Sequence, residues 1–170
     1  TQVVAVCDVK STMRDRAKQA VDAHYGNADC ATYNDFRELL ARDDIDAVSI
    51  ATLDSWHVVH ALAAVRAGKD IYVEKPLGMS IQEINTLRNA VHRYGRVFQF
   101  GTQQRSSAEF RHACEIARNG RLGKLHTIKV GVHAGAAERS GLRTYSPEPV
   151  PDWLDYDLWL GPAPGHLTRP

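Results

Sequence analysis

The stretch that decides the fold runs from residue 45 to residue 76 and reads IDAVSIATLDSWHVVHALAAVRAGKDIYVEKP. Its first eight residues, IDAVSIAT, form a short apolar run, which is typical of a buried strand. Residues 57–67 have the spacing of a helix, and Gly68 supplies a residue at which helices commonly end. Residues 70–74 then predict a second strand. Parallel strands joined through a helix are expected to form a right-handed crossover.

The same alternation of strands and helices continues along the chain in both directions. Helices are expected to start at four places, which are Thr12 with Asp15, Asn34, Ser80 with Glu83, and Ser106 with Glu109. The predicted strands are 3–9, 45–52, 70–74 and 97–102, and helices are predicted to end at Gly26, Gly68, Gly95 and near Gly120. Four strands separated by helices predict an α/β fold with a doubly wound parallel sheet covered on both faces.

The pattern changes after Gly123. Residues 125–134, LHTIKVGVHA, alternate more nearly in steps of two, as in a strand with one covered face, and residues 135–151 are rich in Gly, Ser and Pro. We therefore predict a dinucleotide-binding domain over residues 1–121 and the beginning of a second domain over residues 122–170.

Composition excludes several classes of function. The chain has 170 residues, 21 Lys plus Arg against 20 Asp plus Glu, and a net charge of +1. This balance gives no electrostatic reason to expect nucleic acid or a membrane as a partner. No run of about 18 apolar residues is present. The three cysteines form no repeated spacing, which favours buried thiols in a reducing compartment.

Ligands of such a sheet lie beyond the carboxyl ends of the strands. Asp8 follows the first predicted strand, where a carboxylate can accept hydrogen bonds from the hydroxyls of an adenosine ribose and would repel a 2′-phosphate. A turn or helix-cap acid is the alternative. Lys10, Arg14 and Arg16 could instead receive that phosphate, so NAD is favoured while NADP stays open.

Glu74 is the last residue of the predicted strand 70–74, and Lys75 follows it. Charged side chains at the end of a buried strand are expected either to form an ion pair or to bind a ligand. The Lys75 ammonium could stabilise the alkoxide that develops as hydride leaves a neighbouring carbon, or it could form an ion pair that fixes the turn.

Three further strand-end features carry alternative interpretations. His57 is expected at a helix start facing a cofactor cleft, and no third ligand accompanies His57 and His60 to complete a metal site. Trp56 is a core aromatic or a pocket wall. Gln103 and Arg105 contact nicotinamide, ribose or substrate, or else form a polar turn.

The combined order of AVCD, DIDAVSIAT followed by WH, AGKDIYVEKPLGMS, GTQQR and RNGRLGK resembles the Gfo/Idh/MocA family of nicotinamide-dependent oxidoreductases over about residues 1–133. The resemblance implies a Rossmann domain, followed by an α/β domain whose open, largely antiparallel sheet lines the substrate cleft and often mediates homo-oligomers. It also implies hydride transfer between NAD, or NADP, and a hydroxyl carbon of a sugar, cyclitol or polyol.

The resemblance also implies roles for individual residues. Lys75 would be the catalytic residue and would bind substrate, as would Arg105. The cofactor would be bound by Asp8, Thr52, Asp54, Trp56, His57, Glu74, Lys75 and Gln103. No metal is implied.

Two other functions fit the same residues. Some relatives are glycoside hydrolases that use NAD for transient oxidation at C3, and a third reading is a non-catalytic cofactor-binding module. The cytoplasm is the expected location, although the stretch PEPVPDWLDYDLWLGPAP resembles exported relatives.

The 170 residues contain no GxGxxG turn. We therefore expect a fragment that lacks the first strand with its phosphate turn, lacks the downstream Asp and His of the family, and does not bind NAD by itself. In the usual strand order the missing strand lies at the centre of the sheet.

Overall fold

The computed structural model of the chain describes residues 1–131 and 148–162. Two compact units are present. The first comprises Thr1–Gly101 with Pro149–Gly165, and the second comprises Thr102–Glu148 with His166–Pro170. The domain boundary after residue 121 stays a prediction, because a compact unit defined by contacts is not by itself a folding domain.

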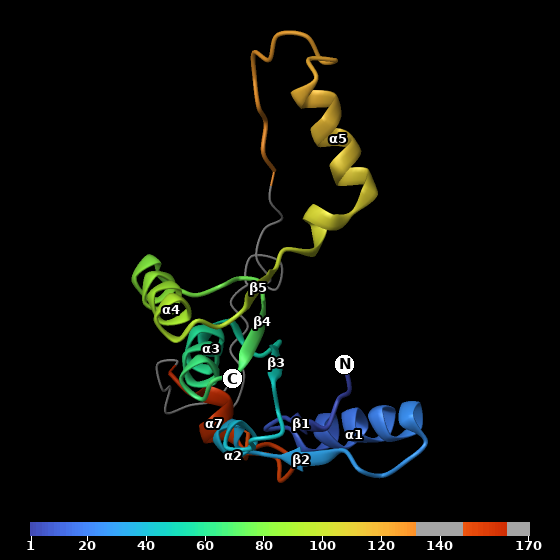
Figure 1. The fold of residues 1–170 in the computed structure, drawn as a ribbon, viewed down its shortest axis with the longest axis vertical. Coiled ribbons are helices and arrows are strands. Elements are labelled where there is room, and N and C mark those ends of the chain that lie inside the picture. The colour runs from blue at the N-terminus through green and yellow to red at the C-terminus, as the bar shows by residue number, and fades with distance from the viewer. Residues whose placement is uncertain (132–147, 163–170) are drawn as a thin grey trace. The chain divides into compact units, whose positions relative to one another are not determined.

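The first unit alternates strands and helices along the chain (Figure 1). Its elements are β1 (Ala5–Cys7), α1 (Ser11–Tyr25), β2 (Ala31–Tyr33), α2 (Phe36–Leu40), β3 (Ala47–Ile50), η1 (Asp54–Trp56), α3 (His57–Arg66), β4 (Asp70–Glu74), α4 (Ile81–Tyr94), β5 (Phe98–Gly101) and α7 (Tyr156–Leu160).

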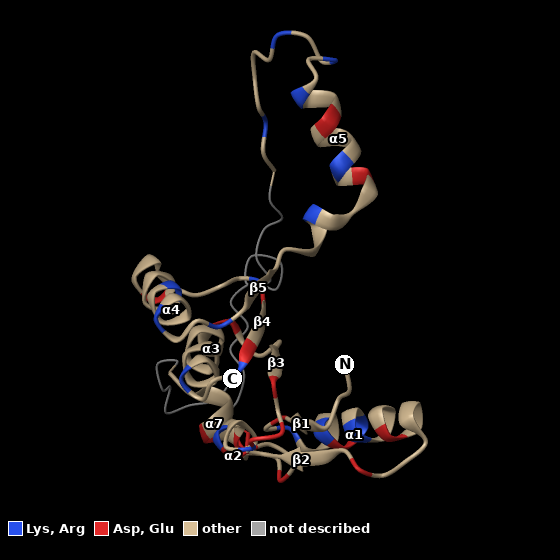
Figure 2. Ribbon diagram, viewed as in Figure 1, with Lys and Arg blue, Asp and Glu red and all other residues tan. Residues whose placement is uncertain are grey.

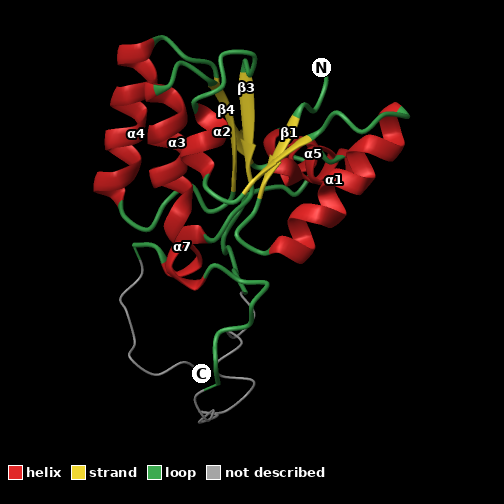
Figure 3. Ribbon diagram, turned by 90° about the horizontal axis from the view of Figure 1, so that it is seen from below, coloured by secondary structure: helices red, strands yellow, loops and turns green. Residues whose placement is uncertain are grey.

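The strands are parallel, and the predicted α/β Rossmann class is confirmed. They form two sheets, β1–β2 and β3–β4–β5 (Figure 3). The division lies between β1 and β3, where the usual strand order of this fold has its central strand. The sequence pattern missed β2, because three residues are too few to show a period of two.

Of the three capped helix starts predicted in the first unit, one agrees with the structure and two do not. Ser80 caps α4 by accepting from the Glu83 N–H at 3.2 Å, as predicted. The expected cap formed by Thr12 and Asp15 is wrong, because α1 already begins at Ser11. The cap expected at Asn34 is also wrong, since Asp35 accepts from the Arg37 N–H at 2.9 Å.

The buried core lies where α3 and α4 pack against the β3–β4–β5 sheet. It comprises Ile50, Val58, Ala61, Ala64, Val65, Ile71, Val73 and Leu87. Burial alternates along β4, and Ala47 and Ser49 of β3 are exposed. The described residues thus bury one face of this sheet more completely than the other.

The second unit contains η2 (Gln103–Ser106) and α5 (Ala108–Arg118). The helix predicted to start at Ser106 begins two residues later, because Ser106 ends the 3-10 turn. The strand predicted over residues 125–134 is wrong for residues 125–131, which form none, and residues 132–134 lie outside the described residues. Ile128 and Val130 are 80% and 84% exposed, so no partner strand covers them within the described chain.

Residues of both charge signs are interspersed along the ribbon (Figure 2), in keeping with the balanced composition. None of the helices in the described ranges is both long and apolar enough to cross a bilayer.

Candidate functional site

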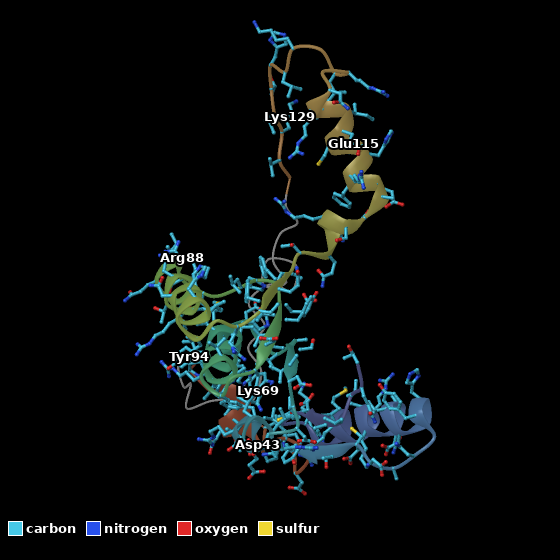
Figure 4. The ribbon with its side chains drawn as sticks, viewed as in Figure 1. Asp43, Lys69, Arg88, Tyr94, Glu115 and Lys129 are labelled. Carbon is cyan, nitrogen blue, oxygen red and sulfur yellow. The ribbon has the colours of Figure 1, made fainter. Side chains whose placement is uncertain are left out.

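The candidate site lies at the carboxyl ends of the strands in the first unit. The register pairs Ile50 of β3 with Val73 of β4, and Glu74 with Gly101 of β5. The loop that follows β3 and the loop that follows β4 therefore leave the sheet at the same edge. Lys69, labelled in Figure 4, precedes β4 at the opposite end, and its buried ammonium donates to the Arg42 carbonyl.

Asp8 follows β1 and is half-buried. Its Oδ1 accepts from the Lys10 N–H at 2.8 Å, which is the contact of a turn acid. Within the described residues Oδ2 has no hydrogen-bond partner. The two interpretations of this residue are thus compatible, because one oxygen shapes the turn while the other is available to a ribose hydroxyl. A carboxylate oxygen that can accept hydrogen bonds fits the hydroxyls of the adenosine ribose of a nicotinamide dinucleotide.

Glu74 and Lys75 have different surroundings. The Glu74 carboxylate accepts from the Lys75 backbone N–H at 3.0 Å and from the Tyr72 hydroxyl at 3.4 Å. The Lys75 side chain is exposed, and its ammonium has no ion-pair partner in the part of the chain that the structure describes. The ion pair considered as the structural role of Lys75 is therefore not formed among these residues, and the ammonium is accessible to a ligand.

His57, at the start of α3, is only 1% exposed. Its Nδ1 lies 2.5 Å from the Pro76 carbonyl oxygen and its Nε2 lies 3.1 Å from the Thr52 carbonyl oxygen. The side chain bridges the two strand-end loops. Its contact with a cofactor stays a prediction, whereas its position already links the loop of Lys75 to the end of β3.

His60 lies one turn further along α3, among aromatic rings. It stacks on Trp56 at 4.6 Å between centroids, approaches Phe36 at 4.4 Å, and its Nδ1 lies 3.2 Å from the Thr52 Oγ1. Burial, together with the nearby His57, lowers the pKa of His60 to about 4. His60 is therefore a neutral packing residue at physiological pH.

The remaining predicted residues lie at two places. Asp54 is exposed in η1, on the loop between Thr52 and His57. Gln103 and Arg105 are exposed in η2, which belongs to the second compact unit. The structure thus collects Asp8, Thr52, Asp54, Trp56, His57, Glu74 and Lys75 in one unit, and the placement of Gln103 and Arg105 at the same site stays a prediction.

Sequence reasoning missed one part of this edge, residues 149–162, here called the returning segment. It forms an antiparallel bridge between Leu154 and Lys10, in which Ser11 donates to the Trp153 carbonyl at 2.9 Å and Asp155 donates to the Val9 carbonyl at 3.0 Å. In the sequence Trp153, Tyr156 and Trp159 have the spacing of a helix, and Tyr156 and Trp159 stack. Nothing in that spacing indicated which strand end the segment would contact.

Trp56 is held by the returning segment. Its Nε1 donates to the Trp159 carbonyl at 3.3 Å. A Cβ built on Gly161 would lie 2.1 Å from the indole carbons of Trp56, so the glycine rests directly against the ring. Of the two interpretations given for Trp56, packing is the one that these contacts support, and a cofactor contact stays a prediction.

Comparison with known proteins agrees with this arrangement. A family model described as "Oxidoreductase family, NAD-binding Rossmann fold" matches residues 1–102. The chain belongs to the Gfo/Idh/MocA family. Its Rossmann unit is therefore an NAD-binding one, as the resemblance implied.

Individual relatives show what share of a longer protein the chain matches. The uncharacterized oxidoreductase YrbE of Bacillus subtilis is 30% identical over 129 residues, which are 76% of this chain and 36% of that protein. A glycosyl hydrolase family 109 protein of Saccharopolyspora erythraea is 42% identical over 87 residues, which are 48% of this chain and 18% of that protein.

Among solved structures, scyllo-inositol dehydrogenase from Lactobacillus casei, with bound NAD(H) and scyllo-inositol, has a TM-score of 0.61 and 27% identity. The match covers 72% of this chain and 34% of that structure. The chain thus spans about a third or less of the length of each of these three proteins.

Proposed function

We propose that the whole protein transfers a hydride between a nicotinamide cofactor and a hydroxyl carbon of a sugar, cyclitol or related polyol. The observation that carries the proposal is the accessible Lys75 ammonium at the carboxyl edge of an NAD-binding sheet. The solved relative that holds NAD(H) together with scyllo-inositol supports a small polyhydroxylated substrate.

In this proposal each residue of the site has a separate role. Asp8 binds the adenosine ribose through the oxygen that the Lys10 N–H leaves available. Lys75 donates to the substrate hydroxyl oxygen and stabilises the negative charge that develops there, as the hydroxyl proton passes to a general base of the whole protein and the hydride leaves the carbon for NAD. Glu74 orients Lys75 through the backbone N–H. Bound NAD supplies the hydride acceptor. NADP stays a second candidate because Lys10 and Arg16 are also near the ribose end.

A second candidate function is an NAD-dependent glycoside hydrolase that oxidises C3 transiently, with no net redox change. The 42% identity to a glycosyl hydrolase family 109 protein favours it over the first part of the chain. A non-catalytic cofactor-binding module is the third candidate.

The test is NADH absorbance with a panel of cyclitols, sugars and glycosides, using the whole protein. A dehydrogenase is expected to accumulate NADH. A glycoside hydrolase is expected to release sugar without accumulating NADH, and a non-catalytic cofactor-binding module is expected to bind NAD without turning over any substrate. Lys75→Ala is expected to lower kcat at least about 100-fold, because a general acid–base group commonly contributes that much. Lys124→Ala, at another exposed lysine, is the control. Unchanged turnover in Lys75→Ala removes Lys75 from the mechanism.

We also propose, from the family resemblance, that the second domain begins near residue 122 and that its sheet joins copies of the whole protein into a homo-oligomer. Cytoplasmic location belongs to the same proposal. Crosslinking and sedimentation of the whole protein, compared with a form that ends at residue 121, test the first two points together.

A further inference from the structure

The returning segment lies on the link between β1 and α1, which is where a Rossmann fold reads the 2′-position of the adenosine ribose. Asp8 sits at the start of this link. Lys10 lies opposite Leu154, and its two neighbours Val9 and Ser11 make the backbone hydrogen bonds to Asp155 and Trp153. A group attached to the 2′-oxygen would therefore meet the returning segment as well as the link itself.

The first consequence concerns the N-terminus of α1. N–H groups in the first turn of a helix have no partner inside the helix and are common binding sites for phosphate. Ser11 is the first residue of α1, and its N–H is already occupied by the Trp153 carbonyl at 2.9 Å. The returning segment thus takes one of the first-turn donors that a 2′-phosphate could use.

The second consequence concerns Arg14, which the sequence offered as a receptor for that phosphate. Its Nη1 donates to the Asn34 Oδ1 at 3.2 Å and is 3.4 Å from the Asp8 carbonyl oxygen. Asn34 in turn donates from Nδ2 to the Asp155 Oδ2 at 2.8 Å. The guanidinium is held in a hydrogen-bonded chain that ends on the returning segment.

The third consequence is electrostatic. Asp155 is half-buried, and its backbone N–H donates to the carbonyl of Val9, the residue after Asp8. Its other oxygen, Oδ1, accepts from the Leu158 N–H at 3.1 Å and so caps α7. Asp155 therefore adds a second fixed carboxylate to the β1–α1 link, whose backbone it contacts one residue after Asp8, and two carboxylates repel a phosphate more strongly than one.

We propose that Asp155, held by Asn34 and Arg14, is a specificity-determining residue that excludes the 2′-phosphate of NADP and so selects NAD. The proposal rests on the NAD-dependent function above, and it adds residues from outside the matched Rossmann stretch of residues 1–102.

The test is the ratio of the dissociation constants of NAD and NADP, measured by titration calorimetry on the whole protein without substrate. Asp155→Asn keeps a good helix cap but removes the charge, and it is expected to shift the ratio about tenfold toward NADP. Asp155→Glu keeps the charge and is expected to keep the ratio. Asp157→Asn, at an exposed acid on the same helix, is the matched control and is expected to change it less than twofold.

Asn34→Ala is the second variant. It releases Arg14 from the chain of hydrogen bonds without changing any charge, and it is expected to shift the ratio in the same direction as Asp155→Asn. An unchanged ratio in both variants overturns the proposal, as does tighter binding of NADP than of NAD by the unaltered protein, which Lys10 would bring about. Binding of neither dinucleotide overturns the proposed function itself.

Discussion

Gly161→Ala is expected to detach the returning segment from the rest of the first unit. Gly161 follows α7 with φ 53° and ψ −129°, a region that alanine adopts at a cost of about 1–3 kcal/mol. The new Cβ would also lie 2.1 Å from Trp56 carbons and 2.4 Å from its Nε1. Overpacking of this kind adds about 1–3 kcal/mol. Together these amount to about 2–6 kcal/mol, enough to open a segment held by a few backbone hydrogen bonds.

Amide hydrogen exchange read by mass spectrometry measures this opening. Peptides covering residues 149–162 and 9–11 are expected to lose protection together in Gly161→Ala, because Ser11 and Asp155 share the same bridge. Gly26→Ala is the matched control, since Gly26 has a φ of 67° with nothing within 4 Å of an added Cβ. Gly26→Ala has only the free-energy cost of placing alanine at a positive φ, without a steric clash, and it is expected to leave both peptides protected. Full protection in Gly161→Ala would refute the reasoning.

Three further predictions concern the core residue Leu87, the histidine His60 and the cysteine thiols. Leu87→Ala, at a side chain only 1% exposed, is expected to lower the free energy of unfolding by about 2–5 kcal/mol in urea titration, and a loss under 1 kcal/mol would contradict the core assignment. Because the folded pKa of His60, about 4, lies below its ordinary value of 6.5, stability should rise with pH between these values, by up to about 1.4 kcal/mol per pH unit. His60→Gln should flatten that rise, and an equally steep rise in the variant would count against it. Iodoacetamide is expected to modify exposed Cys114 first, because burial raises the pKa of Cys7 to about 11 and also raises the pKa of Cys30. Modification of Cys7 before Cys114 would contradict this expectation.

The elements that the sequence predicts well are those whose ends depend on nearby residues. The start of α4 is set by Ser80 and Glu83, three positions apart, and its end by Gly95, so the whole interaction is visible in one short window. The fold class follows from the same local patterns, because buried strands and helices of suitable length alternate through the first hundred residues.

The elements that it misses depend on contacts between distant residues. Asn34 is a good helix cap by composition, but its amide instead binds Asp155, 121 positions away, and the neighbouring Asp35 caps α2. The start of α1 is likewise set by pairing with Trp153. The sequence predicts which polar residues lie at a strand end. It does not predict the hydrogen-bond partner of each polar side chain, because several groups in the chain could form that hydrogen bond equally well.

His57 shows how such a distant contact bears on the chemistry. Both partners of its ring are carbonyl oxygens, which only accept, so a ring N–H must face at least one of them. One of them belongs to Pro76, the residue after Lys75, and the other to Thr52 beyond β3. The exposed ammonium is thus one residue away from a contact buried in the protein. The position of Lys75 at the sheet edge is therefore set from inside the fold, which is the arrangement that an accurately placed hydrogen-bond donor to a substrate hydroxyl requires.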